Sequence, residues 1–127
     1  MSSPWFITPN NIDSEEVISL KRYFENPFDQ RDVLKMCIDI SKMAVALTES
    51  TRKPKVIDID SVGLRGGTLV VVSDLGKEPT QKSLSALAKV ANEISSRLDS
   101  PYRPQATQDL ESFERFGQRA VSLFRTF

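Results

Sequence analysis

Three stretches of the chain place apolar residues every three or four positions, which is the period of an amphipathic helix with one buried face. They cover about residues 31–50, 80–99 and 107–127, and Asn26 or Asp29 stands where a residue could cap the first. The sequence therefore predicts three helices. Their buried positions are Val33, Met36, Cys37, Ile40, Met43, Ala44 and Leu47; Leu84, Leu87, Ala88, Ala91, Ile94 and Leu98; and Leu110, Phe113, Phe116, Gly117, Ala120 and Phe124.

Alternation of apolar and polar residues predicts strands in the remaining chain. Residues 17–24 and 55–62 alternate, whereas residues 68–75 are apolar nearly throughout, which is typical of a central strand. The intervening GLRGG supplies glycines for a hairpin turn, and PWFITP, at residues 4–9, predicts an edge strand or a docked extended segment. We therefore expect an α+β fold in which helices cover one face of a four-stranded antiparallel sheet, in the order β-β-α-β-β-α, with one further helix at the C-terminus.

The length of 127 residues suits a single hydrophobic core. We expect an α+β domain over residues 1–100, with an extended segment at 1–12, and a helical extension over residues 101–127. Seventeen basic and 17 acidic side chains cancel, which argues against nucleic-acid binding. The apolar runs fall short of the roughly 20 residues that cross a bilayer. The N-terminal residues show no pattern of a signal peptide, so we expect a cytosolic protein.

The absence of histidine restricts the possible chemistry more than any other feature of the composition. Histidine is the usual acid–base group near neutral pH and the commonest metal ligand. With a single cysteine as well, zinc sites and catalytic triads are excluded, and we expect no metal and no cofactor. Cys37 lies in the apolar stripe of the first helix, which indicates a buried structural thiol and a reducing compartment.

One family shares both the order of elements and several motif positions with this chain. The shared features are the stretch LKRYFENPFDQRDVLKMCIDISKMAVALTESTRKPKVIDI, the proline at Pro54 and the VVVSD ending of a strand. Over about residues 17–97 they resemble the pterin-4a-carbinolamine dehydratase family. The resemblance implies the α+β fold, and a former active site at the end of the first helix.

The catalytic residues of that family are replaced in this chain. Its paired histidines fall on Arg52 and Lys53, and the histidine of its Thr-His-Asp motif falls on Ser73. Arginine stays protonated and serine alone is a poor base, so the resemblance implies a chain without dehydratase activity. The positions carried over from the family, kept or replaced, are Thr48, Arg52, Lys53, Pro54, Asp60, Ser73, Asp74 and Ser83, with Lys82 as an alternative to Ser83.

Rubisco assembly factors related to this family occur in plastids and beside alpha-carboxysome genes. They keep the scaffold and lack the pterin chemistry, and this chain resembles them because its family histidines are also absent. This likeness implies a chaperone-type protein, not an enzyme, whose client is the Rubisco large subunit. It also implies a place in the bacterial cytosol, with association with the carboxysome as an option, rather than in a plastid, because no transit peptide is seen. It also implies a homodimer, because sheets of the family join edge to edge. Two alternatives stay open: another interaction or dimerisation module on this fold, and an active dehydratase that uses Asp58, Asp60 and Asp74 in place of histidine.

Several side chains are candidates for partner binding, each with a plainer interpretation. The cations Arg52 and Lys53 would contact an acidic surface, or would form a solvated pair that complements a helix C-terminus. Arg65 would mark the hairpin tip as a contact, or belong to a simple turn. Phe113, Phe116 and Phe124 would line a client-binding helix, or pack into the core of this chain. The plainer interpretation is favoured in all three cases.

Overall fold

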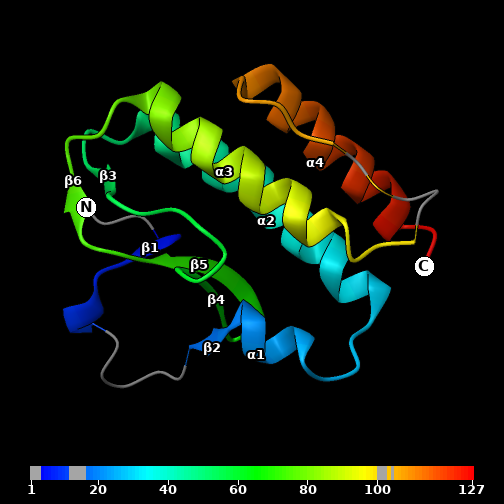
Figure 1. The fold of residues 1–127 in the computed structure, drawn as a ribbon. Helices are drawn as coiled ribbons and strands as arrows, with labels where there is room; N and C mark the ends of the chain where they lie inside the picture. Colours follow the sequence, from blue (N-terminus) through cyan, green and yellow to red (C-terminus); the bar gives the residue numbers. More distant parts are fainter. Residues whose placement is uncertain (1–3, 12–16, 100–102, 104) are drawn as a thin grey trace.

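A computed structural model describes residues 4–11, 17–99, 103 and 105–127 (Figure 1). The strands are β1 (Phe6–Ile7), β2 (Ile18–Ser19), β3 (Lys53–Pro54), β4 (Val62–Arg65), β5 (Thr68–Val72) and β6 (Leu75–Gly76). The helices are α1 (Leu20–Phe24), α2 (Gln30–Glu49), α3 (Thr80–Ser95) and α4 (Leu110–Phe124), with a 3₁₀ turn, η1, at Pro9–Asn11. Residues 1–3 and 12 of the expected N-terminal segment, and residues 100–102 and 104 around the expected domain boundary, lie outside the described residues.

The main sheet has four strands in the order β1-β5-β4-β2. β4 and β5 form the predicted hairpin, and Gly66 and Gly67 at its turn have φ values of 59° and 82°, a region that favours glycine. β2 pairs antiparallel with β4, but β1 pairs parallel with β5. The α+β class is therefore confirmed, whereas the predictions of a wholly antiparallel sheet and of the order β-β-α-β-β-α are wrong. β1 can run parallel because a long connection that includes α2 separates it from β5.

The predicted strand at residues 55–62 is a loop over most of its length. The carboxylate of Asp58 accepts hydrogen bonds from the backbone N–H groups of Asp60 and Ser61, at 3.0 and 2.8 Å. This local turn uses backbone N–H groups that, in a strand, would donate hydrogen bonds to the carbonyls of a neighbouring strand. The chain joins the sheet only at β4, while β3 before the loop pairs with β6 in a separate two-stranded sheet.

The predicted strand at residues 17–24 is mostly the short helix α1. The hydroxyl of Ser19 accepts a hydrogen bond from the backbone N–H of Arg22 at 3.2 Å and so caps the helix start. Leu20 is completely buried, and the residues after it do not pair with another strand. The alternating pattern is misleading here because eight residues are too few to separate a strand from a capped single turn.

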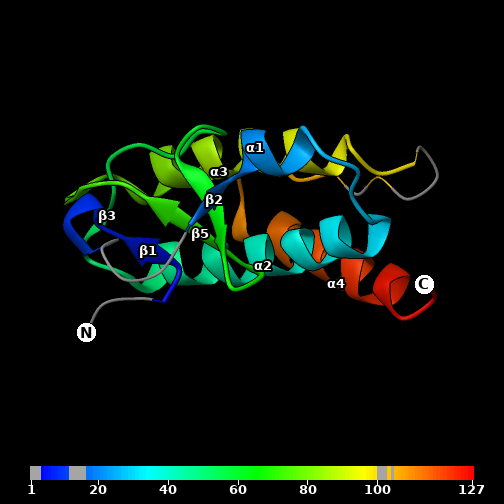
Figure 2. The same cartoon turned by 90° about the horizontal axis from the view of Figure 1, so that it is seen from below.

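All three predicted amphipathic helices are confirmed, and Asp29 caps α2 by accepting a hydrogen bond from the backbone N–H of Arg31. α2 is the centre of the packing: it contacts β5, α3 and α4, and α4 runs alongside it in Figures 1 and 2. α4 adds Phe113 and Phe116 to the same hydrophobic core as α2. The C-terminal helix is therefore packed on the core of the domain.

The buried carboxylate of Asp39 ties α2 to the sheet. Its side chain is 1% exposed, accepts a hydrogen bond from the backbone N–H of Leu69 at 3.1 Å, and forms an ion pair with Lys35 at 2.7 Å. The N–H groups of Val71 and Ser73, further along the same edge of the sheet, bond to the carbonyls of Trp5 and Ile7 on and beside β1. Asp39 thus accepts the hydrogen bond of the Leu69 N–H, in the way that backbone carbonyls on and beside β1 accept those of Val71 and Ser73.

Candidate functional site

Several positions carried over from the dehydratase resemblance meet where β3 pairs with β6. The N–H of Lys55 donates to the carbonyl of Asp74 at 2.8 Å, and the guanidinium of Arg52 donates to the carbonyl of Leu75 at 2.9 Å. Two segments that lie about twenty residues apart in the sequence are therefore side by side.

Lys53 does not belong to a solvated pair of cations. It is 5% exposed, and its Nζ donates a hydrogen bond to the carbonyl of Ser50 at 2.7 Å, which satisfies a carbonyl just beyond the end of α2. Arg52 next to it is exposed. Thr48 is exposed, and its hydroxyl donates to the carbonyl of Ala44 on its own helix at 2.9 Å. Arg52 is therefore the cation of this motif that a partner could reach.

Ser73 has a structural role in the loop. Its side chain is buried, accepts a hydrogen bond from the N–H of Val56 at 3.1 Å, and donates one to the carbonyl of Asp74 at 2.9 Å. The hydroxyl therefore accepts one hydrogen bond from the backbone and donates its single proton to another backbone group. Ser73 therefore has no free donor to offer a substrate, while the neighbouring Asp74 is exposed.

The pocket beside β3 is very small. Pro54 and Ser83 line a pocket of about 20 Å³, which is room for about one water molecule. Asp60 is exposed and does not line this pocket. Thr48 and Asp60 therefore lie outside this pocket, whereas Ser83 reaches it from α3. The expected positions that it brings together around β3 and β6 are Arg52, Lys53, Pro54, Ser73 and Asp74.

A larger cleft, which the sequence did not indicate, lies between residues 57–59 and α3. Its volume is about 540 Å³, and its charged side chains are Asp58, Lys82, Lys89 and Glu93. These charges cancel, and Lys82 also forms an ion pair with Glu78 at 3.0 Å. Among the described residues no group of three or more cysteine or carboxylate side chains is placed to hold a metal ion. This arrangement selects no particular class of ligand.

The aromatic residues proposed as partner contacts belong mainly to the core. Phe113 is 0% and Phe116 is 1% exposed, so both are inaccessible in this structure and their interpretation as partner contacts is not supported. Phe124 is half-buried, and the guanidinium of Arg31 stacks over its ring at 4.1 Å from the centroid. Arg65 is half-buried on β4 opposite Thr68, at the end of the hairpin. Of these candidates only Arg52 has an exposed side chain.

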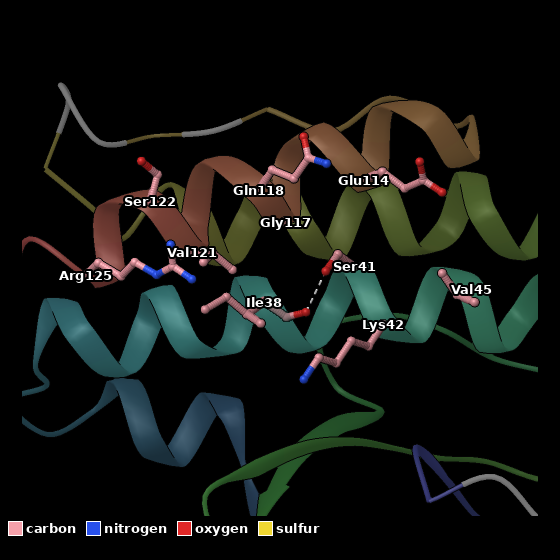
Figure 3. Close-up of a pocket in the computed structure, with 10 residues that line it drawn as sticks. All are labelled: Ile38, Ser41, Lys42, Val45, Glu114, Gly117, Gln118, Val121, Ser122 and Arg125. Carbon is pink, nitrogen blue, oxygen red and sulfur yellow. Dashed lines mark hydrogen bonds between the residues drawn. The ribbon is translucent and has the colours of Figure 1, made fainter.

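An open groove runs between α2 and α4, with a volume of about 550 Å³ (Figure 3). Gly117 lies in the lining of this groove, where α4 comes closest to α2. A Cβ at this position would collide with the Oγ and Cβ of Ser41 on α2. Ser41 donates its hydroxyl to the carbonyl of Ile38 at 2.7 Å, so that polar group is already paired. The sequence patterns did not predict this groove, although the small residues at 41 and 117 are a sign of close helix packing. Its walls are Ile38, Ser41, Lys42, Val45, Glu114, Gly117, Gln118, Val121, Ser122 and Arg125.

Cys37 is confirmed as a buried thiol, 0% exposed within α2. Burial raises its pKa from 9.0 to about 12, because the interior disfavours the thiolate. The thiolate is the reactive form of cysteine, so this side chain is inert near neutral pH. No redox or nucleophilic role is consistent with its position.

Comparison with protein-family models, curated proteins and solved structures found no match for this chain. Within the described residues, no helix is both long enough and apolar enough to span a bilayer. Function must therefore be inferred from the residues and geometry of this chain, and from the resemblance of its motifs.

Proposed function

We propose that this chain is a non-catalytic, protein-binding factor of the bacterial cytosol that assists the assembly of Rubisco, with the large subunit as its client. Its scaffold would be that of the pterin-4a-carbinolamine dehydratases with the active site closed. One observation carries the non-catalytic part: the pocket at Pro54 and Ser83 has a volume of about 20 Å³. A space for about one water molecule cannot admit a bicyclic pterin. The larger cleft of about 540 Å³, which shares Ile57, Lys82 and Ala86 with this pocket, has the room, but none of the positions of the family's histidines lines it.

The chemistry of the surrounding side chains supports the same conclusion. Dehydration of a carbinolamine needs a group that can take up and release a proton near neutral pH. Arg52 remains protonated, Lys53 is buried against the carbonyl of Ser50, and the hydroxyl of Ser73 is bonded on both sides to backbone. One carboxylate oxygen of Asp58, Oδ1, accepts both backbone N–H groups of its own turn. No imidazole therefore stands at the positions of the family's histidines.

The test is a pull-down of the tagged full chain from cells that make Rubisco subunits, read by mass spectrometry. We expect the large subunit as the dominant partner. We also expect no acceleration of carbinolamine dehydration by the purified protein. If the large subunit is absent while other proteins are captured specifically, the chain is another interaction module. If dehydration is accelerated, the protein is an enzyme and the proposal of a closed site is wrong.

A charge-reversal variant locates the binding surface. Arg52→Glu changes an exposed cation of the motif, whereas Lys53→Glu would place a charge in a buried position and disturb the fold. The matched control is Lys21→Glu on α1, an exposed cation away from β3 in Figures 1 and 2. We expect Arg52→Glu to weaken capture of the client several-fold and Lys21→Glu to leave it unchanged. Equal capture by both variants would exclude this motif as the contact.

A further inference from the structure

The groove between α2 and α4 presents an apolar centre with charged ends. Ile38 and Val121 face each other across it, and the side chain of Arg125 extends towards Ile38 (Figure 3). Glu114 lies at the other end of the exposed stripe on α4, and the side chain of Gln118 points away from α2. Ile38 and Val121 are both only half-buried. An apolar strip with a polar rim is the composition of a protein–protein contact.

The sequence spacing along α4 keeps these residues on one face. Glu114, Gln118, Val121 and Arg125 are separated by four, three and four positions, which is the repeat of a helix face that packs on another helix. Neither Glu114 nor Arg125 has an ion-pair partner among the described residues. The stripe is thus negative at the N-terminal end, apolar and neutral in the middle, and positive at the C-terminal end.

The charges of such a stripe are complementary to those of a second, antiparallel copy of the same stripe. If a second copy of α4 lies antiparallel on the first, with the two-fold axis midway between Gln118 and Val121, each Glu114 meets the Arg125 of the other copy. Gln118 then lies against Val121 of the other copy. In a two-fold interface every such contact occurs twice, so one complementary pair of charges becomes two.

The neighbouring helix fits the same arrangement. α2 runs antiparallel to α4 and places Ile38 opposite Val121 in Figure 3, so the axis also brings the Ile38 side chains of the two copies together. Lys42 extends away from α4 and so away from this centre. The hydroxyl of Ser41 is paired with the carbonyl of Ile38 and loses no hydrogen bond when the groove is covered.

We infer that the α2–α4 groove is the interface of a homodimer, with a second copy of this chain as its occupant and α4 antiparallel to α4. The four helices α2 and α4 of the two copies would form an antiparallel bundle. The edges of the main sheet fit a dimer less well, because β1 and β2 each have only two residues. This interface is separate from the β3–β6 site, so it does not depend on the proposed function.

Sedimentation equilibrium of the full chain over a range of concentrations tests the inference. We expect a reversible dimer whose dissociation constant rises with salt, since part of its stability comes from exposed charges. Glu114→Arg and Arg125→Glu each place two like-charged pairs across the axis, and each should raise the dissociation constant about tenfold. The double variant exchanges the charges and should return the constant close to that of the original protein. Circular dichroism confirms that each variant is folded.

A control separates the contact from a general effect of charge. Arg119→Glu makes the same change on α4 at an exposed position that does not line the groove, and it should leave the dissociation constant unchanged. A monomer at all concentrations overturns the inference and leaves the groove to a different partner. A dimer that ignores both single variants uses another face. Failure of the double variant to recover excludes the antiparallel register.

Discussion

At the scale of single residues, Asp39 has the strongest structural role. It is a buried carboxylate whose acceptor function serves the N–H of Leu69 at the edge of β5, while Lys35 balances its charge. A buried N–H without an acceptor destabilises a fold by about 1–3 kcal/mol. The position of the β4–β5 hairpin on α2 therefore depends on this one side chain.

We predict that Asp39→Ala lowers the free energy of unfolding by about 2 kcal/mol or more, because it leaves the N–H of Leu69 without its acceptor and opens a small void. Asp39→Asn keeps an acceptor oxygen and should lose less. Urea denaturation of the two variants beside the original protein measures the difference. Equal losses for alanine and asparagine would mean that the ion pair with Lys35, and not the bond to Leu69, carries the effect.

Charged residues were also the hardest part of the site to place from the sequence. Arg52 and Lys53 are adjacent and chemically similar, yet one is exposed and the other is 5% exposed with its Nζ on a backbone carbonyl. Which of two neighbouring cations turns inward depends on where the free carbonyls beyond α2 lie. That position follows from the folded backbone, and the charge pattern of the sequence does not contain it.

At the scale of elements, the long helices were predictable and the short strands were not. α2, α3 and α4 each repeat the apolar period over at least four turns, so one misleading residue changes little. β1, β2, β3 and β6 have two residues each, and their partners are distant in sequence. The parallel pairing of β1 with β5 in particular depends on the course of the whole intervening chain.

The contact between α2 and α4 depends on Gly117. Alanine normally stabilises a helix by about 1 kcal/mol relative to glycine. Here we predict the opposite: Gly117→Ala should lower the free energy of unfolding by about 1–3 kcal/mol, because its methyl group would collide with Ser41. Thermal or urea denaturation measures the change.

A double-mutant cycle tests this explanation. Ser41→Gly removes the atoms that the new methyl group would meet, so Gly117→Ala should destabilise the fold less in that background. Gln118→Ala, one position along α4 and exposed, is the matched control and should change stability little. Additive effects of the two substitutions would show that they do not interact, and that the helix approach is not limited by this contact.

At the scale of the whole molecule, two raised pKa values set the stability at alkaline pH. Burial raises the pKa of Cys37 from 9.0 to about 12. Burial, followed by the hydrogen bond to Asp32, raises the pKa of Tyr23 from 10.0 to about 12. The folded protein therefore keeps protons that the unfolded chain releases from about pH 9 upwards.

We predict that this stabilising contribution is complete below pH 9 and is lost progressively as the pH rises towards 12. Denaturant titrations across this range measure the fall in unfolding free energy. Tyr23→Phe keeps the ring contacts with Phe24 and Phe28 and removes the phenol. Its stability should fall less steeply above pH 10, and an identical slope would show that Tyr23 contributes nothing to the alkaline transition.

The parallel pairing of β1 with β5 has a consequence for the order in which the molecule folds and opens. The β4–β5 hairpin closes a loop of a few residues, whereas pairing Phe6 with Val71 closes almost half the chain. Long loops close late and at a greater entropic cost, so β1 should dock last and detach first. In hydrogen exchange, the amides of Val71 and Ser73, which bond to Trp5 and Ile7, should lose protection before that of Val72, which bonds to Ser61. The N-terminal strand β1 would then detach from β5 in a local opening, while the rest of the domain stays folded.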